Sequence, residues 1–221
     1  DMFESYVDVE RLMEHLDSYQ VSKAMTPRMF QYYLVKRAMQ ERKHIVLPEG
    51  NDDRILLAAS KLQELDILDL TILGESEKIK SSIERLNIPF DFDKTSIINP
   101  EESDYLKEFT NTLYELRKHK GLSPAMAEDL MRDVSYFGTM MVYKGMADGM
   151  VSGAAHTTQH TIRPALQFIK TKPGFSVVSS IFFMCLEDRV SIFGDCAINP
   201  NPTAEELSEI AIASAESSIA F

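Results

Sequence analysis

The stretch HIVLPEGNDDRILLAASKLQELDILDLTILG, residues 44–74, predicts the fold class. HIVLPEG is typical of a short buried strand that runs into a loop. NDDRILLAASKLQEL is typical of a helix, and its acidic first turn suits the positive end of the helix dipole. LDLTILG then predicts a second strand. A strand, a helix and a strand of these lengths indicate an α/β protein with a parallel sheet.

The same alternation continues on both sides of this stretch. Thr26 and Pro27 supply an N-cap and a first-turn proline, so the sequence predicts a helix before the first strand. After residue 74 the predicted elements are a charged helix over 75–86, the strand TSIINP, a helix over 101–119, a helix from Ser123 to about Lys144, the strand ADGMVSG and the helical segment HTTQHTIRPALQFIK. We therefore expect a three-layer α/β arrangement, with a mostly parallel sheet covered by helices on both faces.

The pattern changes after Gly174. SVVSSIFFMCL and VSIFGDC are two strand-like runs separated by a charged turn, and Thr203 to Glu206 has the spacing of a capping box at a helix start. We predict that residues 1–24 are a linker or connecting helix, that residues 25–173 are a first α/β lobe, and that residues 174–221 begin a second lobe.

Composition excludes several classes of partner. The formal charge is −11 and no block of lysines and arginines forms a basic face, so we expect no nucleic-acid binding. No apolar run approaches the roughly 20 residues that a membrane helix needs, so we expect no membrane partner. Cys185 and Cys196 lack CxxC spacing, which favours reduced thiols in a cytoplasmic protein.

The sequence has no GxGxxG, GxxxxGK[ST], HExxH or GxSxG motif. We therefore predict no metal site and no covalently bound cofactor. The chain begins at Asp1 and stops at Phe221 within an amphipathic segment, and we interpret it as a piece of a longer protein.

Two loops are candidates for ligand binding, because ligands bind beyond the carboxyl ends of the strands in open parallel sheets. They are PEGNDDR, residues 48–54, and SGAAHTT, residues 152–158. Gly153 allows backbone amides to approach a ligand, and Thr157 and Thr158 place hydroxyls and N–H groups at a helix start. Arg163 could add a guanidinium. The alternative is an ordinary strand-to-helix turn with an exposed arginine.

Other candidates also have simpler explanations. His156 is a catalytic candidate or a hydrogen-bonded packing residue. Arg117, in YELRKHKG, lies where the helix dipole alone favours a cation. Arg54 is most simply a surface partner of Asp52 or Asp53, and the aspartate of FGDCAINP is most simply a turn residue.

Five motifs occur in order, namely MTPRMFQYYLVKRA, IVLPEGNDDR, YELRKHKG, DGMVSGAAHTTQHTIRPALQFIKTKPG and FGDCAINPNPTAEELSEIAI. From about Met25 to Phe221 the chain resembles the phosphate acetyltransferases, also called phosphotransacetylases. The resemblance implies exchange of an acetyl group between acetyl phosphate and coenzyme A. It also implies two α/β lobes similar to those of isocitrate and isopropylmalate dehydrogenases, with the site between them and the second lobe incomplete in this chain.

The resemblance also implies which residues bind substrate. They are Arg117, Arg163, Ser152, Gly153, Thr157, Thr158 and, at the edge of the cleft, Arg54. The implied partners are acetyl phosphate, coenzyme A or acetyl-CoA, and phosphate, with coenzyme A as a substrate and not as a resident cofactor. A homodimer of the full-length protein is implied as well.

The catalytic residues implied by the resemblance lie elsewhere. The serine and arginine that assist the oxyanion, and the aspartate base, belong to motifs downstream of the segment EELSEIAIASAES. We therefore expect no catalytic residue in this chain and little or no turnover by the 221 residues alone. Strong acetyl-CoA formation by the purified chain would contradict this expectation.

Two other functions are open from the sequence. Some malic enzymes carry a phosphotransacetylase-like region that senses acetyl-CoA without transferring the acetyl group, so a regulatory module is the first alternative. A dehydrogenase on the related fold is the second, but it needs a nicotinamide site and metal-binding carboxylates, of which the sequence gives no sign.

Overall fold

The computed structural model describes Asp8, Arg11 and residues 25–221. The linker or connecting helix predicted for residues 1–24 therefore lies outside the described residues, apart from Asp8 and Arg11.

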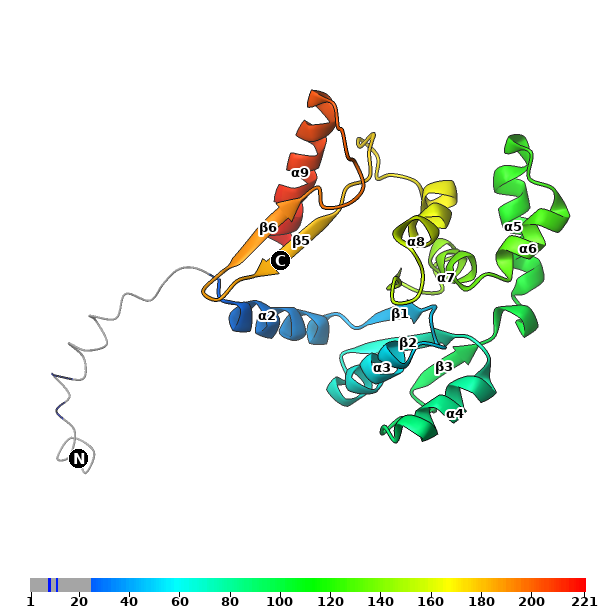
Figure 1. The fold of residues 1–221 in the computed structure, drawn as a ribbon, viewed down its shortest axis with the longest axis horizontal. Coiled ribbons are helices and arrows are strands. Elements are labelled where there is room, and N and C mark those ends of the chain that lie inside the picture. The colour runs from blue at the N-terminus through cyan, green and yellow to red at the C-terminus, as the bar shows by residue number, and fades with distance from the viewer. Residues whose placement is uncertain (1–7, 9–10, 12–24) are drawn as a thin grey trace.

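The centre of the fold is a four-stranded parallel sheet with the order β3-β2-β1-β4. Its strands are β1 (Lys43–Leu47), β2 (Leu68–Leu73), β3 (Thr95–Ile98) and β4 (Gly149–Met150). Ile45 lies opposite Leu70 on β2 and opposite Gly149 on β4, so β1 is an inner strand. The predicted α/β class with a parallel sheet is confirmed (Figure 1).

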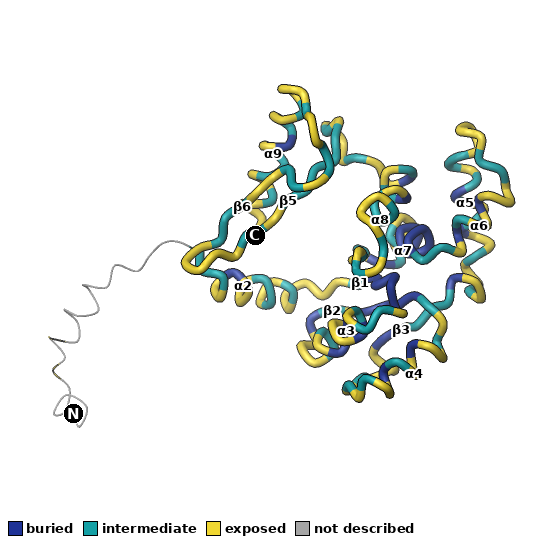
Figure 2. The backbone as a smooth tube through the Cα atoms, viewed as in Figure 1, coloured by how far each residue is buried: buried dark blue, intermediate teal, exposed yellow. Residues whose placement is uncertain are grey.

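Helices cover both faces of this sheet. One apolar cluster joins Leu47 and Ile72 of the sheet to α3 (Asp53–Leu65) and α4 (Ser76–Leu86). The other joins Val46 and Leu73 to α5 (Leu106–Arg117), α6 (Pro124–Met131) and α7 (Val134–Tyr143). Neighbouring residues of β1 and β2 thus point to opposite clusters, as the alternation of a strand requires. Figure 2 shows the buried backbone concentrated in this part of the molecule.

Two predicted elements differ from the structure. The helix predicted from Ser123 to about Lys144 is two helices, because the carboxylate of Asp133 caps a new start by accepting hydrogen bonds from the N–H groups of Ser135 and Tyr136. The helix predicted over 101–119 begins later, since the short 3-10 helix η1 (Pro100–Glu102) precedes α5.

The chain after β4 is helical, as predicted, but it changes type. α8 (Thr158–Pro164) leads into the π-helical turn η3 (Ala165–Ile169). Phe168 of η3 is buried in the same cluster as α5 and α7. The segment that carries Arg163 is therefore anchored to the helical layer.

A second unit contains an antiparallel hairpin of β5 (Ile181–Cys185) and β6 (Val190–Gly194), followed by α9 (Ala204–Ala220). Both strands and the capping box of Thr203 and Glu206 are confirmed. α2 (Pro27–Gln40) packs here, because the ring of Phe30 stacks on Phe183 with centroids 5.1 Å apart. The boundary at residues 173 and 174 between two lobes stays a prediction.

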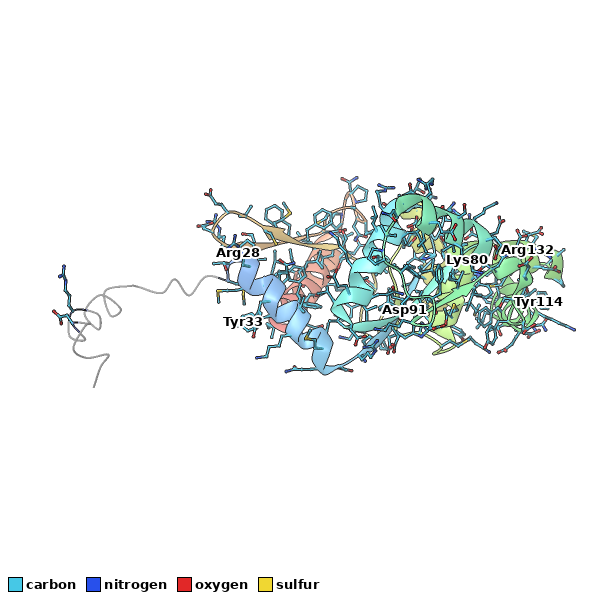
Figure 3. All side chains as sticks on the ribbon, turned by 90° about the horizontal axis from the view of Figure 1, so that it is seen from below. Arg28, Tyr33, Lys80, Asp91, Tyr114 and Arg132 are labelled. Carbon is cyan, nitrogen blue, oxygen red and sulfur yellow. The ribbon has the colours of Figure 1, made fainter. Side chains whose placement is uncertain are left out.

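The two units follow one another along the long axis of residues 25–221 (Figure 3). Figure 3 shows α2 with Arg28 and Tyr33 at one end, and Tyr114 and Arg132 at the other. No helix among the described residues is long and apolar enough to cross a membrane.

Candidate functional site

The SGAAHTT loop is organised by a carboxylate from another strand end. Glu49 follows β1, and its side chain is fully buried. One of its oxygens accepts hydrogen bonds from the N–H groups of Gly153 and Ala154, at 2.9 and 2.8 Å. The other accepts from the N–H groups of Ala155 and His156, each at 2.8 Å. Four consecutive backbone donors of this loop thus share one internal anion.

The side chain of His156 completes this arrangement, because its Nδ1 lies 2.8 Å from Glu49 Oε1, the oxygen that accepts from the N–H groups of Ala155 and His156. Gly153 has φ +118°, a backbone conformation that side chains disfavour and that lets the loop wrap around the carboxylate. Burial alone raises the pKa of Glu49, but the hydrogen bonds from Ala155, Ala154 and His156 outweigh it and lower the pKa to about 2.

The amides expected to approach a ligand are therefore already occupied. The N–H groups of residues 153–156, which we expected to approach a bound ligand, instead donate to the carboxylate of Glu49. The next residue, Thr157, caps α8, since its hydroxyl accepts from the N–H of His160 at 3.3 Å. Ser152 lies 3.4 Å from Thr161, hydroxyl to hydroxyl.

A cleft of about 790 Å³ lies beside α8. It brings together Arg117, Thr158 and Arg163, three of the residues assigned from the sequence. Apolar and amide side chains from α8 and η3 also line the cleft, namely Gln159, Ile162, Leu166 and Gln167. Ala197 and Ile198 of the second unit complete the lining. Two guanidiniums from different helices thus border one cleft between the two units.

The arginines lie near a connected set of polar groups. Arg117 Nη1 donates to the backbone oxygen of Gln167 at 3.4 Å, and the Tyr136 hydroxyl donates to the side-chain oxygen of Gln167 at 3.2 Å. Burial raises the pKa of Tyr136, against the opposing charge of Arg163. The tyrosine is therefore a neutral donor at physiological pH, and it fixes η3 next to both guanidiniums.

The facing wall of the cleft is held by Asp195. Its carboxylate accepts from the hydroxyl and N–H of Ser180 and from the backbone and side chain of Asn199. These bonds lower the pKa of Asp195 against the effect of burial. The turn that carries Ala197 and Ile198 is consequently rigid, which agrees with the simpler explanation of this residue as a turn residue.

Arg54 lies away from this cleft. Its guanidinium donates to Asp52 at 3.0 and 2.7 Å and also to the backbone oxygen of Ala154. It is 70% exposed at the side chain and joins the two candidate loops to each other. Of the seven assigned residues, Arg54, Ser152, Gly153 and Thr157 do not line the cleft in the described structure, so their binding roles stay predictions.

Asp133, His156 and His160 each place a potential metal-binding atom within 4.8 Å of the others. The two imidazoles stack, with centroids 4.7 Å apart and planes 16° apart. A ring nitrogen binds a metal close to the plane of its own ring, and two stacked rings whose planes are only 16° apart are poorly arranged to bind one ion together. His160 Nε2 instead lies 3.0 Å from Asp133 Oδ2, so hydrogen bonding explains the cluster.

Sequence reasoning marked the loop of residues 48–54 without singling out Glu49, and it missed Tyr136 and Gln167. A usable signal existed for Glu49 alone, because an acidic residue directly after a buried strand lies at the sheet edge where ligands and neighbouring loops meet. Tyr136 and Gln167 lie within helices and carry no local pattern that distinguishes them.

The fold and cleft define an α/β protein with a paired-arginine cleft between two units. The chain belongs to the phosphate acetyl/butaryl transferase family, whose match covers residues 29–221. This confirms the resemblance found in the sequence.

Similar proteins agree with this family membership. A phosphate acetyltransferase from Synechocystis sp. is 53% identical over 214 residues, which are 97% of this chain and 31% of the relative. One from Corynebacterium glutamicum is 53% identical over 197 residues, which are 89% of this chain and 59% of the relative. A solved phosphotransacetylase from Staphylococcus aureus matches with a TM-score of 0.79 and 45% identity, over 90% of this chain and 58% of that one. The chain thus spans just under a third to somewhat over half of these relatives' lengths.

Proposed function

We propose that the protein containing this chain transfers an acetyl group reversibly between acetyl phosphate and coenzyme A. The observation that carries this proposal is the pair Arg117 and Arg163 bordering one cleft. Family membership supports the same reaction class. Acetyl phosphate and the phosphates of coenzyme A are anions, and guanidiniums hold such groups through two parallel hydrogen bonds.

The charged, apolar and hydroxyl side chains of the cleft have different roles in this proposal. Arg117 and Arg163 hold the phosphoryl group or a phosphate of coenzyme A. Ile162, Leu166 and Ile198 supply the apolar lining that suits a short acyl chain. Thr158, the first residue of α8, adds a hydroxyl to the cleft.

The reaction then follows from ordinary acyl-transfer chemistry. The coenzyme A sulfur attacks the acetyl carbonyl, its thiol proton passes to a base, and the carbonyl oxygen becomes a transient oxyanion. The carbonyl reforms as the bond to phosphate breaks, and phosphate leaves with the electron pair. Positioning of the two anions supplies much of the acceleration. The base and the oxyanion donors are expected in the part of the relatives that this chain does not span.

The finer architecture belongs to the same proposal. We expect two lobes like those of isocitrate and isopropylmalate dehydrogenases, a homodimer and a cytoplasmic location for the full-length protein. The exposed apolar residues Phe182, Phe193 and Leu207 of the second unit support further packing there. Light scattering of the full-length protein tests the dimer.

The regulatory alternative is not favoured, because the relatives that match are named as transferases. Thioester formation from acetyl phosphate and coenzyme A, followed by absorbance with the full-length protein, tests the choice. We expect turnover that needs both substrates. Tight acetyl-CoA binding without turnover would overturn the transferase proposal and support a sensing module.

A further inference from the structure

Glu49 is a fully buried side chain that accepts several hydrogen bonds and does not line the cleft. It has no exposed surface, yet it carries a charge. Burial of a carboxylate is costly unless its oxygens are fully hydrogen-bonded. Here both oxygens are satisfied by donors from one loop, which lies 104–107 residues away along the chain.

The backbone that carries Glu49 is itself fixed. The N–H of Gly50 donates to the backbone oxygen of Leu73 at 3.1 Å, and the N–H of Asp52 donates to the backbone oxygen of Glu49 at 3.0 Å. A Cβ on Gly50 would lie only 2.6 Å from the oxygen of Leu73. The chain after β1 is therefore pressed against β2, and the Glu49 carboxylate is presented from a rigid base.

Contacts continue from this carboxylate toward the cleft. The ring of His156 stacks on that of His160 in α8, and His160 bonds to Asp133 at the start of α7. The same α8 carries Arg163 three residues later. α8 is thus held at its first turn by groups whose positions depend on the loop around Glu49.

We propose that Glu49 is a positioning residue for the cleft: it holds the loop of residues 153–156 and thereby fixes where α8 places Arg163. Its carboxylate also occupies the hydrogen-bond donors of the loop, so a substrate anion binds at the arginines and not at the loop. The kinetic part of this inference rests on the proposed acetyl transfer, whereas the loop-holding part stands on the hydrogen bonds alone.

Chemical rescue tests the inference in the full-length protein. In Glu49→Ala the five donors from residues 153–156 face a space that formate fits. We expect the KM for acetyl phosphate or for coenzyme A to rise by about tenfold or more, since small misplacement of a binding group costs up to about a hundredfold. Formate should restore much of the loss. Glu49→Gln should show a similar defect without rescue, because its side chain fills the space and turns an NH₂ toward two N–H donors.

Controls separate positioning from general damage. Wild-type enzyme in the same formate corrects for inhibition at the active site, and Glu101→Ala removes an exposed carboxylate outside the loop. Loss of folded enzyme lowers kcat and leaves KM unchanged, whereas a misplaced Arg163 raises KM. Hydrogen exchange of residues 153–156 should speed up by about tenfold or more in Glu49→Ala and slow again with formate.

Two results would overturn the proposal. Unchanged exchange of residues 153–156 in Glu49→Ala would show that the carboxylate does not hold the loop. Fast exchange with normal KM would show that it holds the loop but does not position the site. If the wild-type protein lacks acetyl transfer, the proposed function fails by itself, and coenzyme A affinity measured by calorimetry replaces KM in the same comparison.

Discussion

Glu49→Gln should remove a pH-dependent part of the stability. The folded protein lowers the pKa of Glu49 from 4.5 to about 2, because its loop donors favour the charged form. That difference corresponds to roughly 3 kcal/mol, since a tenfold change in proton binding is worth about 1.4 kcal/mol. With a depressed folded pKa, this stabilisation is present above pH 4.5 and is lost as the pH falls toward 2.

The loss of this stabilisation can be measured at pH values between 4.5 and 2. About 2 kcal/mol of the stabilisation should be gone by pH 3, and less than about 1 kcal/mol by pH 4. The glutamine variant does not titrate, so the free-energy difference between wild type and Glu49→Gln should shrink by these amounts as the pH is lowered from 6.

Urea unfolding followed by circular dichroism at pH 6, 5, 4 and 3 measures this difference in the full-length protein. Other carboxylates titrate in both proteins and cancel in the comparison. A difference that stays constant over this range would refute the assignment of the lowered pKa to Glu49, and with it the view that the loop donors hold a charged carboxylate.

Three further predictions concern single positions. Gly50→Ala should destabilise by about 3 kcal/mol in urea unfolding, because the added Cβ meets the backbone oxygen of Leu73 at 2.6 Å; Gly149→Ala, whose nearest neighbour lies at 3.4 Å, is the control and should cost much less. Thr203→Ala removes half of the capping box and should cost about 1 kcal/mol by the same assay; no change would contradict the cap. Arg117→Ala should raise the KM for acetyl phosphate or for coenzyme A about tenfold, and unchanged KM values for both substrates would remove it from the site.

The sequence was a good guide to the elements and a poor one to their long-range partners. Local rules were sufficient for the N-cap at Thr26, the hairpin and the capping box, because each depends on residues a few positions apart. The break at Asp133 was missed since apolar spacing continues through it, and only the capping bonds mark the new helix.

The sequence was likewise a good guide to some residues of the site and a poor guide to others. Arg117, Thr158 and Arg163 were assigned by resemblance and meet in one cleft. The role of the SGAAHTT loop could not be deduced, because its donors bind a carboxylate from a segment about a hundred residues earlier. A local pattern can show that a loop suits an anion, but it does not show whether the protein supplies that anion itself.

The central claim is that Arg163 holds an anionic substrate in the cleft beside α8. Steady-state kcat/KM for acetyl phosphate and for coenzyme A in the full-length protein tests it most directly, with Arg163→Ala compared with Arg189→Ala, which removes an exposed arginine of the hairpin. We predict a loss of at least about tenfold for Arg163→Ala and almost none for the control. Equal kcat/KM for both substrates in Arg163→Ala and wild type would contradict the claim.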